Sequence, residues 1–116
     1  MALRPGSLVT VSFPFTDLSA VKRRPALVLI VHGEDLIVCG VTSKISRRRD
    51  AIPLDESQMA EGRLPKPSEI RPLKLFTIHR ALVHTLVGRI SAETLGRVTA
   101  LKVAPLPRGR RPKTSA

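Results

Sequence analysis

Three consecutive cations, Lys22, Arg23 and Arg24, stand directly before Pro25 and an almost unbroken apolar run, 26-ALVLIV-31. Proline fixes its own backbone and steers the preceding residue toward extended geometry, so Arg24 should be held at the mouth of a rigid strand. A guanidinium binds two phosphate oxygens in a fixed fork and stays charged at any ordinary pH. The pattern therefore predicts that the guanidinium of Arg24 is held in a fixed position that would suit a phosphate, whereas Lys22 and Arg23 are solvated cations that attract phosphate.

A large excess of positive charge surrounds this candidate. Lys and Arg total 20 against 9 Asp and Glu, which gives a net charge of +11 and indicates a polyanionic partner. The tail 105-PLPRGRRPKTSA-116 holds four cations and no acid, so 16 cations against 9 acids remain elsewhere. Two alternatives stay open: Arg24 could form a surface ion pair with Asp17, and 47-RRR-49 could be a solvated loop or could grip a nucleic-acid backbone.

The single cysteine and the apolar runs exclude several classes of protein. Cys39 lies between Val38 and Gly40, which is typical of a small buried hydrophobe, and one cysteine excludes an internal disulfide and a multi-cysteine metal cage. No apolar run reaches the roughly 18 residues of a membrane span, and the N-terminus lacks the pattern of a signal peptide. We expect a soluble cytoplasmic protein.

The elements that would position Arg24 are strands. Segment 7-SLVTVSF-13 alternates between apolar and polar residues, as a half-buried strand does, and segment 14–24 reads as a loop. The runs 26–31 and 36-LIVCGVT-42 flank a polar, glycine-containing turn at 32–35, so they predict an antiparallel hairpin at the centre of a sheet.

The second half of the chain predicts weaker elements and one helix. Region 43–69 is polar and should run over the surface with at most a short strand at 52–54, and further strands are expected at 69–77 and 86–90. Segment 91-SAETLGRVTALKV-103 predicts a helix capped by Ser91 and weakened by Gly96.

Together these elements predict one domain over residues 1–104 and a disordered basic tail over 105–116, whose proline and cation content cannot support a core. About five short strands with one terminal helix favour a small, strongly curved antiparallel sheet or a partly open barrel.

An ordered set of motifs resembles the PemK/MazF family of bacterial toxins over about residues 5 to 104. The set comprises 6-GSLVTVSFPFTDLSAVKRRPALVL-29, 41-VTSK-44, 67-PSEIRPLKLFTIHR-80 and 88-GRISAETLGRV-98. The resemblance implies an SH3-like, partly open antiparallel β-barrel with a C-terminal helix. It further implies a homodimeric, metal-independent endoribonuclease, the toxin of a type II toxin-antitoxin system, which cuts single-stranded RNA by 2′-hydroxyl attack and leaves a 2′,3′-cyclic phosphate.

By the same resemblance the catalytic pair is Arg24 and Thr42, which ends the strand after the hairpin turn. Their types suit the reaction, because charge that develops on the phosphoryl oxygens would be met by a guanidinium and a hydroxyl donor without a metal or cofactor. Further contacts with RNA are expected from seven residues: Phe15, Ser19, Lys22, Arg23, Ser43, Lys44 and His79. Phe15 is the best candidate for base stacking.

The partners implied are single-stranded RNA and a cognate antitoxin, which the positive charge predicts to be acidic. Two other classes remain open. A non-catalytic, nucleic-acid-binding SH3-like barrel would explain the charge equally well. A gyrase-poison-type toxin of related fold would act by protein contact, but such toxins are known for a C-terminal tryptophan and this chain has none.

Overall fold

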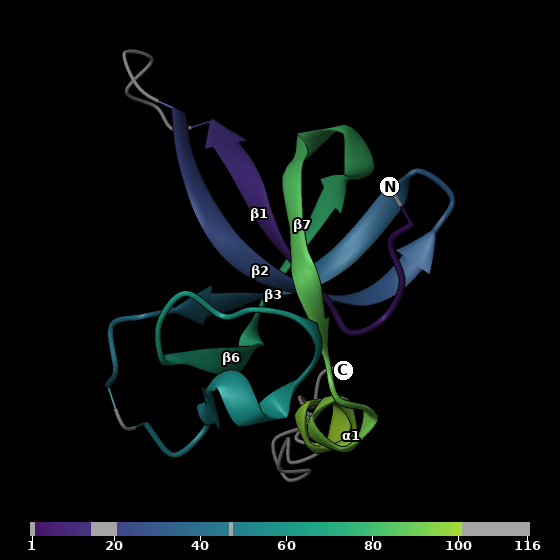
Figure 1. The fold of residues 1–116 in the computed structure, drawn as a ribbon. Helices are drawn as coiled ribbons and strands as arrows, with labels where there is room; N and C mark the ends of the chain where they lie inside the picture. Colours follow the sequence, from purple (N-terminus) through teal and green to yellow (C-terminus); the bar gives the residue numbers. More distant parts are fainter. Residues whose placement is uncertain (1, 15–20, 47, 101–116) are drawn as a thin grey trace, which may run out of the picture.

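The computed structural model describes residues 2–14, 21–46 and 48–100. This part of the chain forms one curled antiparallel sheet with a short helix below it (Figure 1). The elements, in chain order, are β1 (Ser7–Pro14), β2 (Val21–His32), β3 (Asp35–Thr42), β4 (Ile52–Leu54), the 3-10 helix η1 (Glu56–Gln58), β5 (Met59–Gly62), β6 (Ser68–His79), the 3-10 helix η2 (Arg80–Leu82), β7 (Val83–Ile90) and α1 (Ala92–Ala100).

The strand order is β4-β6-β3-β2-β1-β7-β5, which places the β2–β3 hairpin near the centre of the sheet as the sequence predicts. Gly33 adopts φ 63° in the turn of that hairpin, a left-handed conformation that glycine adopts without strain. The expected strands at 7–13, 36–42 and 52–54, and those near 69–77 and 86–90, correspond to β1, β3, β4, β6 and β7. The prediction of a mainly β, partly open barrel with a C-terminal helix is confirmed.

The prediction that segment 14–24 is a loop was wrong for Pro14, which ends β1, and for residues 21–24. β2 begins at Val21, and Arg24 and Pro25 pair with Val11 and Thr10 of β1. Strand β3 pairs with β2 only from Ala26 onward, so the edge of β2 that faces β3 is unpaired at Pro25. Proline has no backbone N–H, and at this unpaired edge no hydrogen bond to β3 is lost.

Strand β5 was also missed. It lies in the segment that was expected to cross the surface with at most one short strand, and its residues are mostly exposed. What holds it is backbone pairing with β7, in which Glu61 opposes Arg89 and Gly62 opposes Gly88. Such pairing leaves no apolar alternation for sequence analysis to detect.

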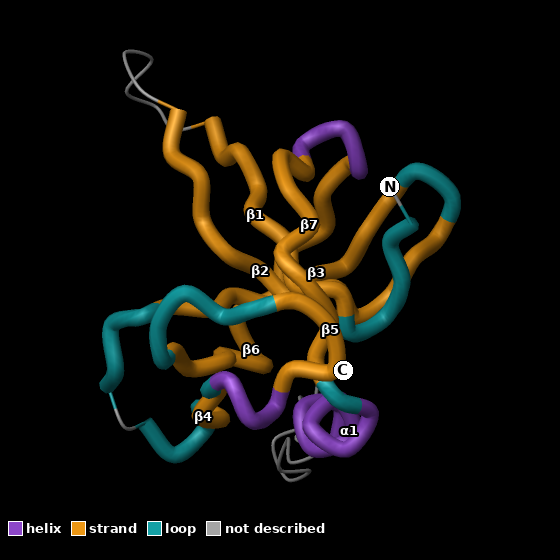
Figure 2. Tube along the Cα trace, viewed as in Figure 1, coloured by secondary structure: helices purple, strands orange, loops and turns teal. Residues whose placement is uncertain are grey.

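The sheet is forced to curl because its two edge strands are joined by only four residues. Six inter-strand spacings would separate β4 and β5 by roughly 29 Å in a flat sheet, whereas the link over 55–58 spans at most roughly 17 Å. The link is stabilised by a capping box, in which Asp55 accepts from Ser57 N at 2.9 Å and Gln58 Oε1 accepts from Asp55 N at 2.6 Å. Figure 2 shows this short helical link between the two edge strands.

Alternate residues of the strands divide the core between two clusters, as the two-residue strand period requires. One cluster includes Leu8, Leu27, Cys39, Val41 and Ile70 together with Val98 of α1, and the other comprises Val9, Val11, Ala26, Val28, Leu36, Val38 and Ile78. Cys39 is fully buried, which confirms its interpretation as a core residue, and burial raises the pKa of its thiol to about 12.

Helix α1 starts where the sequence predicts. Ser91 Oγ accepts a hydrogen bond from Thr94 N at 3.2 Å and so caps the first turn, and Val98 is buried against the sheet. The predicted helix extended to residue 103, and residues 101–103 lie outside the described part of the chain. The predicted tail over 105–116 also lies outside it and stays a prediction. Among the described residues, no helix combines the length and the apolar character needed to cross a membrane.

Candidate functional site

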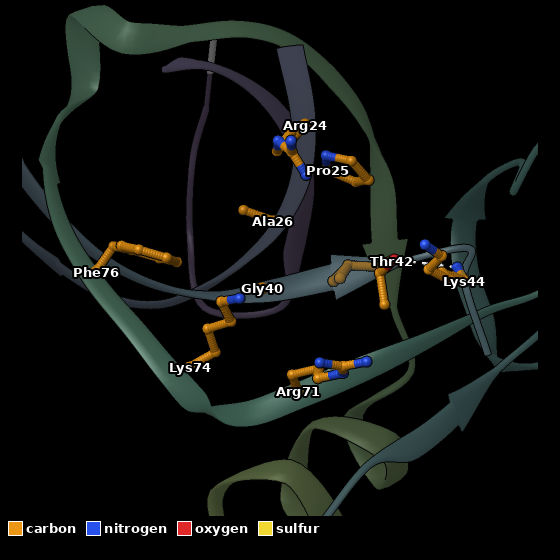
Figure 3. A pocket seen from close by; sticks show the side chains of 10 residues that line it. Arg24, Pro25, Ala26, Gly40, Thr42, Lys44, Arg71, Lys74 and Phe76 are labelled. Atoms are coloured by element: carbon orange, nitrogen blue, oxygen red, sulfur yellow. Dashed lines mark hydrogen bonds between the residues drawn. The ribbon is translucent and has the colours of Figure 1, made fainter. Parts of the chain in front are cut away.

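A cleft of about 440 Å³ opens between β2, β3 and β6 (Figure 3). It is lined by Arg24, Pro25, Ala26, Gly40, Val41, Thr42, Lys44, Arg71, Lys74 and Phe76. This lining contains four cations and no carboxylate, so the cleft concentrates positive charge on one concave surface. Such a surface suits a ligand that carries phosphate groups.

The cleft exists because β2 and β3 stop pairing. Ala26 opposes Gly40 and Leu27 opposes Cys39, so the same register continued by two residues would place Arg24 opposite Thr42. The described pairing ends at Ala26 and Gly40 instead, and the side chains beyond that point line the cleft. The structure thus brings Arg24 and Thr42 to the same opening from two strands, as the motif order led us to expect.

An irregularity in β6 provides the third wall. Leu75 opposes Cys39, but the next pair along β3 joins Gly40 to Arg71, so residues 72–74 bulge out of the ladder. The bulge carries the stem of Lys74 across Gly40, where an added Cβ would lie 3.6 Å from Lys74 Cγ and Cδ. Lys74 therefore extends across β3 at Gly40 and brings its ammonium group to the cleft, as Figure 3 shows.

The hydroxyl of Thr42 has a defined hydrogen-bonding role in the turn that follows β3. Its Oγ1 accepts a hydrogen bond from Lys44 N at 3.0 Å. This bond occupies a lone pair of the oxygen, and the hydroxyl proton can still be donated to a ligand. Thr42 is half-buried and Lys44 is exposed, so the turn presents a hydroxyl and an ammonium group to the same cleft.

The same turn is tied to β6 by a buried carboxylate. Glu69, which is 3% exposed, accepts hydrogen bonds from Ser46 N at 2.8 Å and from Ser46 Oγ at 3.1 Å. Arg71 Nη2 in turn donates to Ser46 Oγ at 3.2 Å. One serine therefore joins the turn beyond Thr42 to both a buried acid and a cation of the cleft.

Several other predicted RNA contacts lie outside the cleft or outside the described residues. Lys22, Arg23 and Ser43 are exposed and do not line the cleft, whereas Lys44 does. Phe15 and Ser19 lie in segment 15–20, outside the described residues, so their predicted roles stay predictions.

His79 lies far from Thr42. It opposes Asp35, at the other end of β3, and the seven residue steps from Asp35 to Thr42 correspond to roughly 23 Å along a strand. Its Nδ1 accepts a hydrogen bond from Ala81 N at 2.9 Å and caps η2. The structure therefore gives His79 a local capping role and does not bring it to the cleft.

Two members of the 47–49 arginine run can be placed. Arg48 donates to Asp50 at 3.1 Å, and this hydrogen bond lowers the pKa of the Asp50 carboxyl group. Arg49 is exposed. Neither side chain lines the cleft, and Arg47 lies outside the described residues.

Sequence analysis did not select three lining residues, Arg71, Lys74 and Phe76, as site residues. All three come from β6. The strand predicted at 69–77 contains them, but the sequence does not show which of its side chains point toward the cleft. The available clue was the presence of two cations, Arg71 and Lys74, among the apolar residues at the middle of this segment. Their common placement depends on the bulge at 72–74, which no short-range pattern predicts.

In the part of the chain that the structure describes, no group of three or more His, Cys, Asp or Glu residues is arranged to hold a metal ion. The chemistry available in the cleft is instead that of guanidinium, ammonium and hydroxyl donors.

Comparison with known proteins gives one match to a family and several matches in fold. The sequence profile described as "PemK-like, MazF-like toxin of type II toxin-antitoxin system" matches residues 4–102. A search of curated protein sequences gave no match. The family match spans the whole described sheet and α1.

Three solved structures illustrate the similarity in fold. An endoribonuclease in complex with its cognate antitoxin, from a mycobacterial species, is 11% identical over 86% of this chain and 90% of its own, with a TM-score of 0.68. The Mycobacterium tuberculosis toxin MazF-mt6 is 18% identical over 84% of this chain and 99% of its own, with a TM-score of 0.59. The MazE-MazF structure from Deinococcus radiodurans is 22% identical over 82% of this chain and 87% of its own, with a TM-score of 0.64.

Proposed function

This chain belongs to the PemK-like, MazF-like toxins of type II toxin-antitoxin systems, and from that premise we propose that it is a metal-independent endoribonuclease acting on single-stranded RNA. The observation that carries the proposal is the placement of Arg24 and Thr42 at one cleft that is lined by four cations and no acid. A polyanion that enters such a cleft meets both side chains at the point where β2 and β3 separate.

The proposed reaction is an attack of a ribose 2′-oxygen on the adjacent phosphorus. A new P–O2′ bond forms, the P–O5′ bond breaks, the 2′-hydroxyl loses its proton and the departing 5′-oxygen gains one. Negative charge builds on the two non-bridging oxygens, where preorganised donors have their greatest effect on the rate. The products are a 2′,3′-cyclic phosphate and a free 5′-hydroxyl.

Arg24 and Thr42 are assigned to charge stabilisation. The fork of Arg24 suits the two non-bridging oxygens, and the hydroxyl of Thr42 can donate a second bond while its oxygen accepts from Lys44 N. Neither group is assigned the proton transfers, because a guanidinium is a poor titrating group near neutral pH.

Lys44, Arg71 and Lys74 are proposed to hold the flanking phosphates. Each adds affinity that is independent of base sequence and sensitive to salt. Phe76 is 37% exposed and lines the same cleft, so it offers a ring face on which a base can stack. Phe15 keeps its predicted stacking role as part of the proposal.

The proposed partners are a second copy of the chain and an antitoxin with an acidic segment. One of the similar structures is named as an endoribonuclease in complex with its cognate antitoxin. Charge complementarity favours an acidic segment laid along the cleft. For the dimer, light scattering should give about twice the 12.7 kDa chain mass at micromolar concentration, and a monomer mass would contradict it.

The direct test is incubation of the purified chain with a long single-stranded RNA in excess EDTA, followed by mapping of the cut sites and their ends. A second RNA carries one 2′-deoxynucleotide on the 5′ side of a mapped cut. Discrete cuts with 2′,3′-cyclic ends, lost only at the deoxy position, are expected. RNA binding without cuts would instead identify a non-catalytic binding barrel, and cleavage that requires added Mg²⁺ would refute the metal-free mechanism.

A further inference from the structure

Glu69 is a buried acid beside a cleft that is otherwise cationic. It pairs with Thr42 across the β3–β6 ladder, and the residue is only 3% exposed. An ionised carboxylate is costly to bury unless hydrogen bonds or cations compensate the charge. Its position next to a candidate catalytic residue therefore calls for a role beyond packing.

The contacts of Glu69 lead directly into the turn after Thr42. Both carboxylate oxygens lie within hydrogen-bond distance of Ser46 N, at 2.8 and 3.3 Å, and of Ser46 Oγ, at 3.1 and 3.2 Å. The backbone and the side chain of one residue are thus held by the same acid. This double contact fixes where the turn returns toward the sheet.

The turn is fixed at both ends as a result. At its start, Thr42 Oγ1 accepts from Lys44 N, and at its end Ser46 is held by Glu69. Lys44 lies between these two attachments and lines the cleft. A substitution of Glu69 would therefore change the positions of both the hydroxyl of Thr42 and the ammonium group of Lys44.

A second branch of the network reaches the opposite wall of the cleft. Ser46 Oγ lies 3.2 Å from Arg71 Nη2, so one hydroxyl can donate to Glu69 and accept from Arg71. Arg71 also lines the cleft. Ser46 thereby connects the position of the turn to the direction of a cation on β6.

We propose that Glu69 is a positioning residue of the ribonuclease site. Through Ser46 it holds the 42–46 turn and Arg71 in the geometry in which Thr42, Lys44 and Arg71 meet one RNA backbone. The proposal rests on the function proposed above, since it assigns Glu69 a part in the same cleft. Glu69 itself does not line the cleft, so it acts through its neighbours.

The two attachments predict different kinetic effects. Replacing Glu69 frees the turn and so displaces Thr42, whose proposed contribution is made in the transition state. Ser46→Ala instead keeps the backbone bond from Ser46 N to Glu69, which holds the turn, and removes the hydroxyl that bridges Glu69 and Arg71. Glu69→Ala should thus lower kcat, and misplacement by about 1 Å can cost about 100-fold. Ser46→Ala should raise KM several-fold with kcat nearly unchanged, because Arg71 is proposed to bind the ground state.

The experiment measures kcat and KM for RNA cleavage with the full chain and four variants: Glu69→Ala, Glu69→Gln, Ser46→Ala and Ser46→Thr. Glu69→Gln keeps the size of the side chain and can still accept from Ser46 N, but its amide nitrogen cannot accept from the hydroxyl, so an intermediate loss of about 10-fold is expected. Ser46→Thr restores the hydroxyl and should restore KM. Glu61→Gln, which alters an exposed acid paired with Arg89 at 2.8 Å, is the matched control and should keep wild-type kinetics.

Each outcome decides the proposal. Wild-type kcat and KM in folded Glu69→Ala and Ser46→Ala would overturn it. If Glu69→Ala does not fold, the kinetics of Ser46→Ala, Ser46→Thr and Glu69→Gln test the proposal instead. A KM that is unchanged in Ser46→Ala would overturn the link to Arg71.

If the wild-type chain cuts no RNA, the proposed function fails separately. The affinity of the same variants for a fluorescein-labelled RNA oligonucleotide is then the readout. Unchanged affinity in Ser46→Ala would overturn the positioning role, and a several-fold loss that Ser46→Thr restores would support it.

Discussion

Arg24 of β2 and Thr42 of β3 each lie two residues beyond Ala26 and Gly40, the last backbone pair between the two strands. In a continued ladder they would be direct neighbours, and their side chains would share the sheet face of Ala26 and Gly40. Because the described pairing ends at Ala26, the two residues instead stand on separate walls of a cleft. Because the strands separate here, a space opens between the guanidinium of Arg24 and the hydroxyl of Thr42, and a phosphate can enter it.

Removing only the hydroxyl of Thr42 should slow cleavage. Thr42→Val keeps the shape of the side chain but deletes the proposed donor to the phosphoryl oxygens, and loss of one such donor costs about 100- to 1000-fold in kcat. Thr42→Ser keeps the hydroxyl and should retain most of the activity. Single-turnover cleavage of a defined RNA measures both, and equal rates for the Val and Ser variants would remove Thr42 from the mechanism.

The cations of β6 should carry part of the salt dependence of RNA binding. For single-stranded nucleic acid, each phosphate contact contributes about 0.7 to the slope of log affinity against log salt concentration. Arg71→Ala and Lys74→Ala should each reduce the slope by about that amount, whereas Arg97→Ala, on the exposed side of α1, should leave it unchanged. Fluorescence anisotropy titrations over several salt concentrations provide the slopes, and unchanged slopes for both β6 variants would place the RNA elsewhere.

The β5–β7 edge should not tolerate a side chain at position 62. Gly62 has φ 81°, and an added Cβ would collide with the backbone of Val87 and Gly88. Gly62→Ala should therefore destabilise the fold by more than about 1 kcal/mol. At Gly96 nothing lies within 4 Å of an added Cβ, so Gly96→Ala should stabilise α1 by about 0.5 to 1 kcal/mol. Urea unfolding compares the two variants, and a neutral Gly62→Ala would contradict the close backbone approach.

The core thiol should make stability depend on alkaline pH. Burial raises the pKa of Cys39 from 9.0 to about 12 in the folded chain, so between these values the unfolded chain loses a proton that the folded chain keeps. The contribution of this thiol to stability is therefore present below pH 9 and falls by about 1.4 kcal/mol per pH unit as pH rises toward 12.

Cys39→Ala removes this titration and serves as the control. The difference in unfolding free energy between the wild type and Cys39→Ala, measured from pH 8 to 11, should shift steadily in favour of the variant. A constant difference, or rapid alkylation of Cys39 in the folded chain at pH 8, would show that the thiol is not buried.

Sequence patterns predicted the elements that bury alternate side chains and missed those that lack such an alternation and depend largely on backbone pairing. β1 and β3 carry clear apolar patterns, and the hairpin between β2 and β3 carries a glycine turn, so these were predicted close to their observed bounds. Three cations and Pro25 concealed the extension of β2 back to Val21. The strand β5 was missed altogether because its residues are mostly exposed and show no apolar alternation. In both, the strand exists because a neighbouring strand supplies hydrogen bonds.

The candidate site divides in the same way. Pro25 indicated from the sequence that Arg24 is held at the start of an apolar strand, and the resemblance of the ordered motifs selected Arg24 and Thr42 as a pair. Arg71, Lys74 and Glu69 could not be assigned in advance. Their positions depend on a bulge in β6 and on a contact that joins residues 46 and 69 across the sheet.

The measurement that tests the central claim most directly compares RNA cleavage by the wild type, Arg24→Ala and Arg23→Ala in EDTA at equal concentration. The two variants remove the same charge from adjacent positions of β2, but only Arg24 lines the cleft. Cleavage at discrete sites by the wild type and Arg23→Ala, with loss of cleavage but retained RNA binding in Arg24→Ala, is the predicted result. Equal cleavage by both variants, or equal loss in both, would contradict a catalytic role for Arg24.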